Sequence, residues 1–420
     1  MIERVSLFNK KRDFLLFLLI SLSIFLISVF IEYKNYLEFT RFDSALIEAT
    51  PQKQYVKTKN KRIYQVLKLK SKEGLTFYTT AKKSLEDLSD KKLYMEIWPK
   101  DISFFSYLNS FYAYSKILSI EDNNSTKQAL NAFIDLAHEN KNIGNIYQAL
   151  YTAKDVDQKT QNAFSNLGVS HIVAISGFHL GILSALLYFL LKPAYIFLQD
   201  RFFPYRNSKT DIFIIVASIL FAYTLFLDSP PSLVRSFGML VVGFILYDRG
   251  IEIFSMQTLL VTILLLLAFF PRLCFSLGFW LSAGGVFYIF LFLIHFKKLN
   301  LFLQMIGISV FVYLYMLPAA LYIFQNFSLY HPTSIILSIL FTPFYPLSIF
   351  LHIIGLGDFF DVFLKWLMIL GQEGIKVELN LYVFMFYVAL SFGAIWSRTA
   401  MWALTLFCGS VFIYAMYQVA

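Results

Sequence analysis

The stretch HIVAISGFHLGIL, residues 171–183, places two histidines, a serine and two glycines inside a run that is apolar enough to enter a bilayer. The whole chain shares this apolar character, since its 420 residues are 58% hydrophobic and only 15% charged. Soluble domains carry about 25% charged residues. Apolar runs long enough to cross about 30 Å of hydrocarbon recur through the second half. The sequence therefore predicts a polytopic α-helical membrane protein with about 9–11 transmembrane or re-entrant helices.

Hydropathy alone predicts a membrane domain over residues 169–420. One short apolar segment, FFDVFLKWLMIL at residues 359–370, cannot cross a bilayer and is predicted to be interfacial or re-entrant. The predicted spans lie near residues 172–191, 211–227, 234–247, 253–270, 273–294, 301–324, 333–355, 381–396 and 400–418.

The N-terminus begins with a basic tail, residues 1–12, followed by an apolar run at residues 13–31. The sequence EYKNYLEF that follows offers no small-residue cleavage site, so an uncleaved transmembrane anchor is favoured over a signal peptide. The basic residues of the tail place the N-terminus in the cytoplasm by the positive-inside rule. The next segment is then extracytoplasmic, and the expected location is the cell (inner) membrane.

Residues 32–168 contain no spanning run and are predicted to form a soluble insert. The stretches RIYQVLKLK, LTFYTTA and KLYMEIW alternate between apolar and polar residues, which predicts a small β-barrel or sheet over residues 32–100. The remainder, residues 101–168, has helical apolar spacing. It is predicted to be an amphipathic helical linker whose aromatic face lies on the membrane surface.

Positive charge is concentrated in the β-rich part of this insert. Residues 51–100 hold 13 Lys or Arg against 5 Asp or Glu, a net +8 out of +9 for the whole chain. A basic surface of this size suits a polyanion. A solvated face that only keeps a β domain soluble explains the same charge, so both interpretations remain open.

Four stretches of the membrane domain carry polar residues, glycine or proline, which mark places that face protein or water rather than lipid. Together, and with Pro332, Pro343 and Pro346 in the last stretch, they predict discontinuous helices around a polar path. On a helix through the first stretch, Ser176 and His179 would point together, while Gly177 and Gly181 would form a close-packing face. A serine that bonds its own helix and a buried packing histidine are the plainer alternatives. The candidates for a polar translocation path are His171, Ser176, Gly177, His179, Arg235, Ser276, Ser282, Pro332, Ser334 and Pro343.

The order of these stretches resembles a known family. SNLGVSHIVAISGFHLGIL, LDSPPSLVRSFGML, PRLCFSLGFWLSAGGV and LPAALYIFQNFSLYHPTSIILSILFTPFYPL follow one another between residues 165 and 347. They are similar to four motifs of the competence membrane channel family, ComEC. This resemblance implies passage of single-stranded DNA into the cytoplasm during natural transformation, with an insert that resembles an OB-fold and faces outside.

An OB-fold would bind a single strand with basic and stacking aromatic side chains. The candidates are Lys57, Lys59, Lys61, Arg62, Lys68, Lys70, Tyr64 and Tyr78, with Tyr55, Phe77 and Trp98 as further stacking candidates. For each aromatic residue, a place in the core of the β domain is the plainer alternative. The implied partners are single-stranded DNA, membrane lipids, an extracytoplasmic DNA receptor, and a cytoplasmic ATPase, helicase or single-strand-binding protein. A separate nuclease is also implied, because the six histidines lack the H-x-H-x-D-H metal signature of longer relatives.

Neither a cofactor nor an enzyme activity is expected, and two rival functions remain. A small-solute or lipid permease would also need a polytopic fold. An intramembrane serine hydrolase would pair Ser176 with His179 or His171, although residues three apart on one helix rarely set that geometry. The two cysteines, Cys274 and Cys408, are interpreted as small buried hydrophobic residues.

Overall fold

The computed structural model describes residues 7–8, 10–59, 62–82, 85, 86, 88, 91–99, 101–122, 126–250 and 255–419. The chain divides into two compact units. The barrel unit comprises Phe8–Ala132 and Ile263–Leu277, and the helical unit comprises Met1–Leu7, Phe133–Thr262 and Gly278–Ala420.

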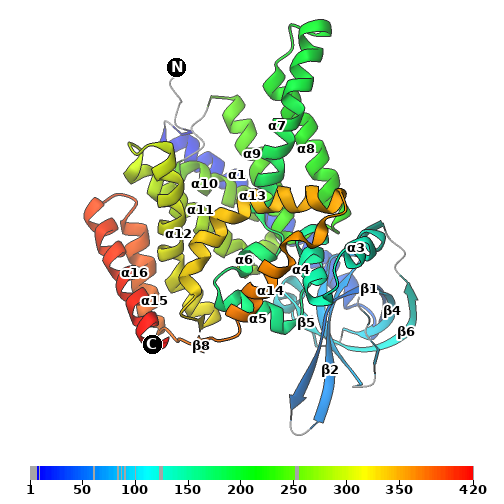
Figure 1. Cartoon of the computed structure of the whole chain (residues 1–420). Coiled ribbons are helices and arrows are strands. Elements are labelled where there is room, and N and C mark those ends of the chain that lie inside the picture. Colours follow the sequence, from blue (N-terminus) through cyan, green and yellow to red (C-terminus); the bar gives the residue numbers. More distant parts are fainter. Residues whose placement is uncertain are drawn as a thin grey trace. The chain divides into compact units, whose positions relative to one another are not determined.

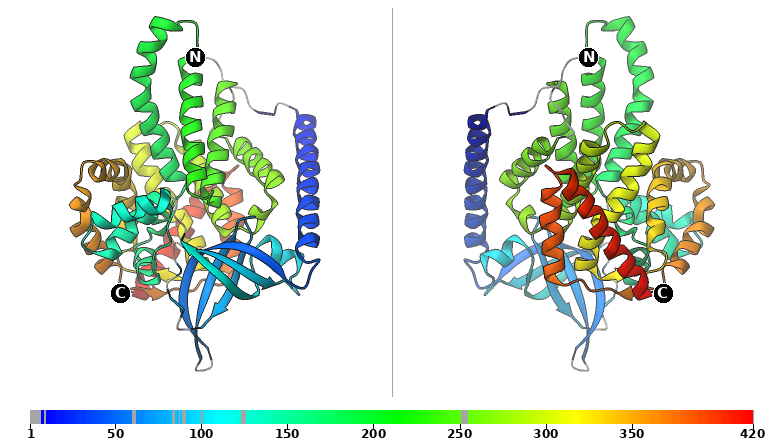
Figure 2. Two further views of the ribbon diagram at one scale, coloured as in Figure 1. Left: turned by 90° about the vertical axis from the view of Figure 1, so that its right-hand side faces the viewer. Right: turned by 90° about the vertical axis from the view of Figure 1, so that its left-hand side faces the viewer.

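The barrel unit is built on one mixed sheet (Figure 2). Its strand order is β5-β3-β2-β1-β4-β6, and only β3 and β5 pair in parallel among the described strands. β5 and β6 are separated by Ala113 alone, so the two ends of this order meet and the sheet closes on itself. The strands are β1 (Ala45–Lys59), β2 (Arg62–Ser71), β3 (Thr76–Ala81), β4 (Lys91–Trp98), β5 (Phe111–Tyr112) and β6 (Tyr114–Asp122).

The apolar alternation of these strands fills the barrel interior. Every second side chain points inward, because successive residues of a strand face opposite sides. Lys68 and Lys70 alternate with these inward residues and point outward from β2. The buried set includes Leu67, Leu69, Phe77, Leu93, Met95 and Ile97. The predicted small β-rich domain is confirmed.

The prediction of a wholly helical linker over residues 101–168 is wrong for its first part. Residues 111–122 form β5 and β6, while α2 (Phe104–Leu108) is a short helix before them. Phe111 and Ala113 are buried, whereas Tyr112 and Tyr114 are exposed. This period of two fits a strand that completes the barrel, so tertiary pairing overrides the helical spacing of the same residues.

The helix α1 (Lys11–Phe39) includes the predicted anchor and continues beyond it to the barrel. Only 6% of its most apolar window is buried, as expected for a helix that faces lipid. Its last turns pack on the barrel core through Tyr36 and Phe39. The Tyr36 hydroxyl donates to the Ile102 carbonyl at 2.7 Å.

The helical unit contains most of the other apolar helices, and the helix at residues 256–269 is divided between the two units (Figure 1). Eight of the nine predicted spans each coincide with one α-helix, whereas the first, 172–191, is interrupted between residues 173 and 177. The short segment at 359–370 contains α14. The helices after α2 are α3 (Thr126–Leu136), α4 (Lys141–Thr152), α5 (Gln158–Asn166), α6 (Ser170–Val173), α7 (Gly177–Phe202), α8 (Ser208–Phe226), α9 (Pro231–Asp248), α10 (Met256–Phe269), α11 (Leu277–Phe296), α12 (Leu301–Phe324), α13 (Ser334–Ile353), α14 (Asp361–Leu370), α15 (Leu381–Gly393) and α16 (Arg398–Val419).

Seven of the described helices, α1 among them, are long and apolar enough to cross a membrane, and α10 and α15 are shorter apolar helices. The chain is therefore a polytopic membrane protein. Between the spans lie three 3-10 turns and a two-stranded ladder: η1 (Pro271–Phe275), η2 (His331–Thr333), η3 (Gly357–Phe360), β7 (Asn326–Phe327) and β8 (Ile375–Lys376).

Buried tyrosines join the helices near the C-terminus. The Tyr288 hydroxyl donates to the Tyr387 hydroxyl at 2.6 Å, and Tyr387 donates to the Tyr315 carbonyl at 2.7 Å. These bonds tie α11, α15 and α12 together. Because a buried phenol needs a hydrogen-bond partner, the bonds also select one arrangement of the three helices.

Candidate functional site

The opening stretch at residues 171–183 is broken rather than one continuous helix. α6 ends at Val173 and α7 begins at Gly177, with Ser176 in an extended conformation as its N-cap. The Ser176 amide donates to His179 Nδ1 at 3.3 Å, and the Phe178 amide donates to Ser176 Oγ at 3.3 Å. Ser176 and His179 do meet, but as a capping box that satisfies free amides at the helix start.

His179 is wholly buried against α13. Its ring lies edge-on to Phe341 and Tyr345, with centroids 4.9 and 4.8 Å away. His171 lies on α6, before the break. Ser176 Oγ and His179 Nδ1 are 3.2 Å apart, yet the described residues place no carboxylate beside His179 to orient it. The geometry of this pair is that of a helix cap.

The two glycines of this stretch differ. A Cβ on Gly177 would lie 2.5 Å from Ser236 Oγ on α9, so Gly177 permits close approach of α7 and α9. A Cβ on Gly181 would have no neighbour within 4 Å. The predicted close-packing face is therefore present at Gly177 and absent at Gly181.

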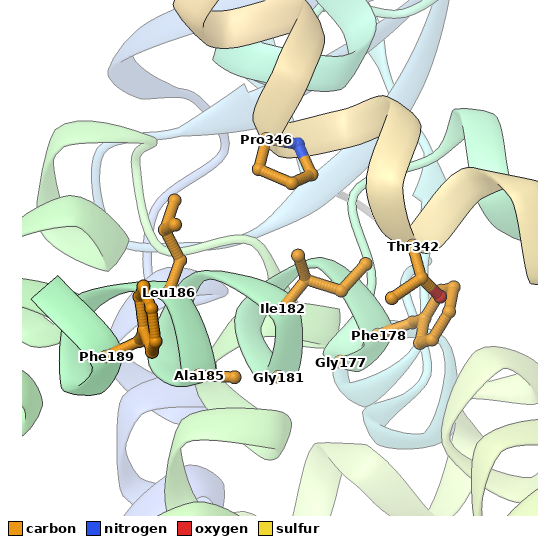
Figure 3. Close-up of a pocket in the computed structure, with 9 residues that line it drawn as sticks. All are labelled: Gly177, Phe178, Gly181, Ile182, Ala185, Leu186, Phe189, Thr342 and Pro346. Carbon is orange, nitrogen blue, oxygen red and sulfur yellow. The ribbon is translucent and has the colours of Figure 1, made fainter.

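Gly181 instead lines a groove of about 520 Å³ between α7 and α13 (Figure 3). Thr342 supplies the one polar side chain of this lining. Because an apolar lining favours hydrocarbon over water, the groove differs from the hydrated wall expected here. Its lining consists of Gly177, Phe178, Gly181, Ile182, Ala185, Leu186, Phe189, Thr342 and Pro346.

Arg235 is a buried cation on α9, with 5% of its surface exposed. The helix starts after Asp228 and Ser229, which both have positive φ, and Pro230 is its N-cap. The Arg235 guanidinium lies 5.9 Å from the ring centroid of Phe279. Its Nε has no hydrogen-bond partner among the described residues. Because burying a cation in a membrane helix is costly, Arg235 remains a candidate for a functional role.

The remaining path candidates are distributed over both units. Ser276 follows η1 in the barrel unit, whereas Ser282 is half-buried on α11 in the helical unit. Pro332 lies in η2, and Ser334 opens α13 with a buried hydroxyl that lacks a partner among the described residues.

The prolines of α13 do not divide it. Pro343 and Pro346 lie inside one continuous helix, so the prediction of a discontinuous helix here is wrong. Each proline still removes an amide donor, which frees the carbonyls of Ile339 and Thr342. Such freed carbonyls are tolerated in membrane helices, because neighbouring helices, side chains or water can supply the missing hydrogen bonds.

A row of outward side chains crosses the barrel. Lys53 pairs with Lys68, Lys68 with Tyr78, and Tyr78 with Tyr112 in the strand register. The Tyr112 and Tyr114 rings lie 5.5 Å apart, and Tyr114 pairs with Trp98. We call this set the barrel row: Lys53, Lys68, Tyr78, Tyr112, Tyr114 and Trp98. It carries cations at one end and exposed aromatic rings at the other.

The exposed rings of the barrel row were not all expected from the sequence. Tyr114 is 72% exposed, Tyr112 47% and Trp98 37%. Tyr112 and Tyr114 fall in the segment predicted as helical, so their register with Tyr78 was not visible. Phe77, in contrast, is fully buried in the core and offers no surface for stacking.

The other nucleic-acid candidates lie along β1 and β2. Lys70 neighbours the barrel row, and Lys57 pairs with Tyr64 farther along the hairpin. Lys59 and Arg62 pair at its end through their backbones. Lys61 lies outside the described residues.

A buried polar cluster was missed altogether. His138, His352 and Asp361 are 6–7% exposed in the helical unit, and His138 lies within hydrogen-bond distance of both His352 and Asp361. They are separated by more than 200 residues at the widest, and no sequence motif connects them. Only the packing of α13 and α14 against the start of α4 brings them together.

The family model described as competence protein matches residues 151–420, which is more than half of the chain. The chain belongs to the competence protein family. It is also 29% identical over 198 residues to ComE operon protein 3 of Bacillus subtilis (strain 168). That match covers 46% of this chain and 23% of the relative, so it spans less than a quarter of the relative's length. No solved structure matches the chain.

The family match covers α7 to α16 and the four polar stretches. The resemblance inferred from those stretches is confirmed. The barrel strands precede the matched residues, so the family match gives no information on the role of the barrel.

Proposed function

We propose that this protein conducts single-stranded DNA into the cytoplasm during natural transformation. The observation that carries the proposal is the barrel row, found in a polytopic chain of the competence family. Lysines suit the phosphates of a strand, and exposed aromatic rings suit its unstacked bases. Base pairs in a duplex hide the faces that Tyr114 and Trp98 would contact, which favours a single strand.

The strand connectivity of the barrel supports an OB-fold-like module. β1 pairs with both β2 and β4, while the last segment pairs in parallel with β3 and then antiparallel with β4. If β5 and β6 are taken as one strand, this is the pairing of a five-stranded closed barrel. OB-folds commonly bind oligonucleotides across such a face.

Charge and helix ends would line the path through the membrane. A strand carries one negative charge per nucleotide, and Arg235 is a buried cation on a helix of the matched domain. The amide ends of α7 and α13 add partial positive charge at Ser176 and Ser334. In this proposal the predicted path residues keep phosphates away from hydrocarbon.

The orientation and the partners are part of the same proposal. A cytoplasmic N-terminus places the barrel outside the inner membrane, where an extracytoplasmic DNA receptor would hand over the strand. A cytoplasmic ATPase, helicase or single-strand-binding protein would supply the pulling force. A separate nuclease would remove the other strand.

The test is a strain that lacks this protein and receives labelled duplex DNA. We expect the label to pass the cell surface without reaching the cytoplasm, and the wild-type chain to restore entry. A chain with Trp98→Ala and Tyr114→Ala should restore entry poorly despite normal amounts in the membrane. Cytoplasmic label at the wild-type level in the deletion strain would refute the proposal. Failure of the purified protein to bind oligonucleotides at low salt would favour a permease.

A further inference from the structure

A chain of three ionisable side chains is buried in the helical unit and joins three segments. His138 lies between α3 and α4, His352 lies in the last turn of α13, and Asp361 opens α14. His138 Nδ1 is 2.9 and 3.1 Å from the two carboxylate oxygens of Asp361. His138 Nε2 is 3.1 Å from His352 Nε2. His352 Nδ1 is 2.7 Å from the Ser348 carbonyl.

These contacts fix how many protons the cluster holds when it is complete. Carboxylate and carbonyl oxygens only accept, so both Nδ1 atoms must carry a hydrogen. Two neutral rings would then face each other with bare Nε2 lone pairs 3.1 Å apart, which is unfavourable. One additional proton converts this contact into an N–H···N hydrogen bond. The number of bound protons is the same if Asp361 carries the additional one. Asp361 then donates to His138 Nδ1, and His138 carries its own hydrogen on Nε2, where it donates to His352 Nε2.

Asp361 makes the additional proton tolerable in a buried position. Burial alone disfavours a charged imidazolium, whereas an adjacent carboxylate favours it. With the proton bound, the three side chains together are neutral, and each of the contacts above has a donor and an acceptor. Without it, Asp361 remains an uncompensated buried charge, which is costly.

Neighbouring side chains pack against the cluster and hydrogen-bond around it, but they do not supply the additional proton. The Tyr147 ring stacks on His138 at 4.6 Å, and the Tyr151 hydroxyl donates to Ser348 Oγ at 2.8 Å. Burial raises the pKa of both phenols above the ordinary value, so they remain protonated. Among the described residues, Tyr223 and Tyr345 contact Tyr151, and Asp135 and Asp358 bring two carboxylates near this region. Both add negative charge, which favours a bound proton.

The cluster holds a helix that has little else polar to anchor it. α14 has ten residues and is too short to cross a bilayer. Its outer face is apolar and exposed, with Val362 at 78% and Ile369 at 66%, as expected for an interfacial helix. Leu364 and Leu367 pack inward on the same core as Tyr147.

We propose that Asp361, His138 and His352 form a proton-binding site, and that the bound proton clamps α14 onto α4 and α13. Above about pH 6.5, where separated imidazoles are neutral, the closed arrangement binds one more proton than an arrangement in which the rings have separated. Closure therefore weakens tenfold for each pH unit from about pH 6.5 up to the pH at which the closed cluster itself releases the proton. Above that release pH the two arrangements bind the same number of protons, so the closing equilibrium no longer changes with pH. This inference does not depend on DNA transport.

The test measures backbone amide exchange of residues 361–370 in the full chain, in nanodiscs, by mass spectrometry. Rates between about pH 5 and about pH 9 are divided by the chemical exchange rate at the same pH, so that the ratio reports opening. In the wild type we expect protection of α14 to fall by up to about tenfold per pH unit between about pH 6.5 and the release point, while protection of α16 stays level.

Two variants make the result specific. His352→Gln places an amide donor opposite His138 Nε2, so the contact is satisfied without an additional proton and protection should become independent of pH. Asp361→Asn removes the charge that balances the additional proton, so it should lower protection near neutral pH and abolish the fall of protection with rising pH. His295→Gln is the matched control, because His295 bonds the Ala394 carbonyl at 2.9 Å elsewhere in the unit. Its pH profile should match the wild type.

Several results would overturn the inference. A wild-type profile that is flat over this range, or the same slope in His352→Gln, would show that no proton is shared. If micromolar zinc raised protection in the wild type but not in His352→Gln, the two Nε2 atoms would bind a metal ion instead. If His352→Gln failed to fold, loss of the slope in Asp361→Asn would support the site, and an unchanged slope there would refute it.

Discussion

The contact between α7 and α9 at Gly177 gives a stability prediction with an internal control. In Gly177→Ala the new Cβ would lie 2.5 Å from Ser236 Oγ and 3.1 Å from Ser236 Cβ. Ser236 cannot turn away freely, because its hydroxyl donates to the Ser232 carbonyl at 2.7 Å. Losing that bond costs about 1 kcal/mol. The remaining crowding of the two helices adds about 1–3 kcal/mol.

The alanine also improves helix propensity by up to about 1 kcal/mol, which offsets part of the cost. We therefore expect Gly177→Ala to lower the free energy of unfolding by about 1–3 kcal/mol, measured by denaturant unfolding in detergent. Gly181→Ala, one turn away on the same helix, has open space and should be neutral or slightly stabilising. Gly177→Leu should in addition block transformation while the protein stays in the membrane.

A double-mutant cycle separates the cost of the lost Ser236 hydrogen bond from the cost of crowding between α7 and α9. In a Ser236→Ala background the hydroxyl is gone, so Gly177→Ala should be less destabilising by about 1 kcal/mol. The reasoning fails if Gly177→Ala and Gly181→Ala have the same effect. It also fails if the effects of Gly177→Ala and Ser236→Ala on the free energy of unfolding are additive.

Three further predictions concern DNA and charge. Tyr114→Ala should weaken binding of a labelled single-stranded oligonucleotide by about 1–3 kcal/mol in fluorescence anisotropy, with an unchanged salt dependence; a Phe77→Leu control reports on barrel folding alone. Lys68→Gln should weaken binding and lower the slope of log affinity against log salt by about 0.7, and an unchanged slope would exclude a phosphate contact. Arg235→Gln should keep or raise the melting temperature, because it removes a buried charge, yet abolish transformation; normal transformation would remove Arg235 from the path.

The spans were predictable because a membrane helix needs a long apolar run, and such runs are visible in one dimension. The β-rich insert was predictable for a similar reason, since RIYQVLKLK alternates cleanly. FYAYSKILSI was not, because its apolar residues fit both periods and only pairing with β3 and β4 decides between them. Strand register likewise determines which aromatic residues share a face with Lys68. The barrel row could therefore not be predicted, because the pairing partners of each strand cannot be read from the sequence.

The polar details of the membrane domain were harder to predict. Ser176 is followed three residues later by His179 rather than by the Glu or Gln of the usual capping box, so the helix start was not recognised. Pro343 and Pro346 suggested a break, but packing holds α13 together. The cluster of His138, His352 and Asp361 joins distant segments, and each residue alone is unremarkable in sequence.

The helix α1 fixes the height of the barrel above the bilayer. Its 29 residues extend about 44 Å, whereas the hydrocarbon is about 30 Å thick, so roughly 14 Å of rigid helix projects beyond the lipid tails. Tyr36 and Phe39 at its far end are packed on the barrel core, and only five residues lead from it into β1. The barrel thus stands on a stiff support and does not drift on a flexible tether. Under the proposed function, a strand bound there would advance by sliding over a stationary surface, since the barrel itself would not travel to the membrane.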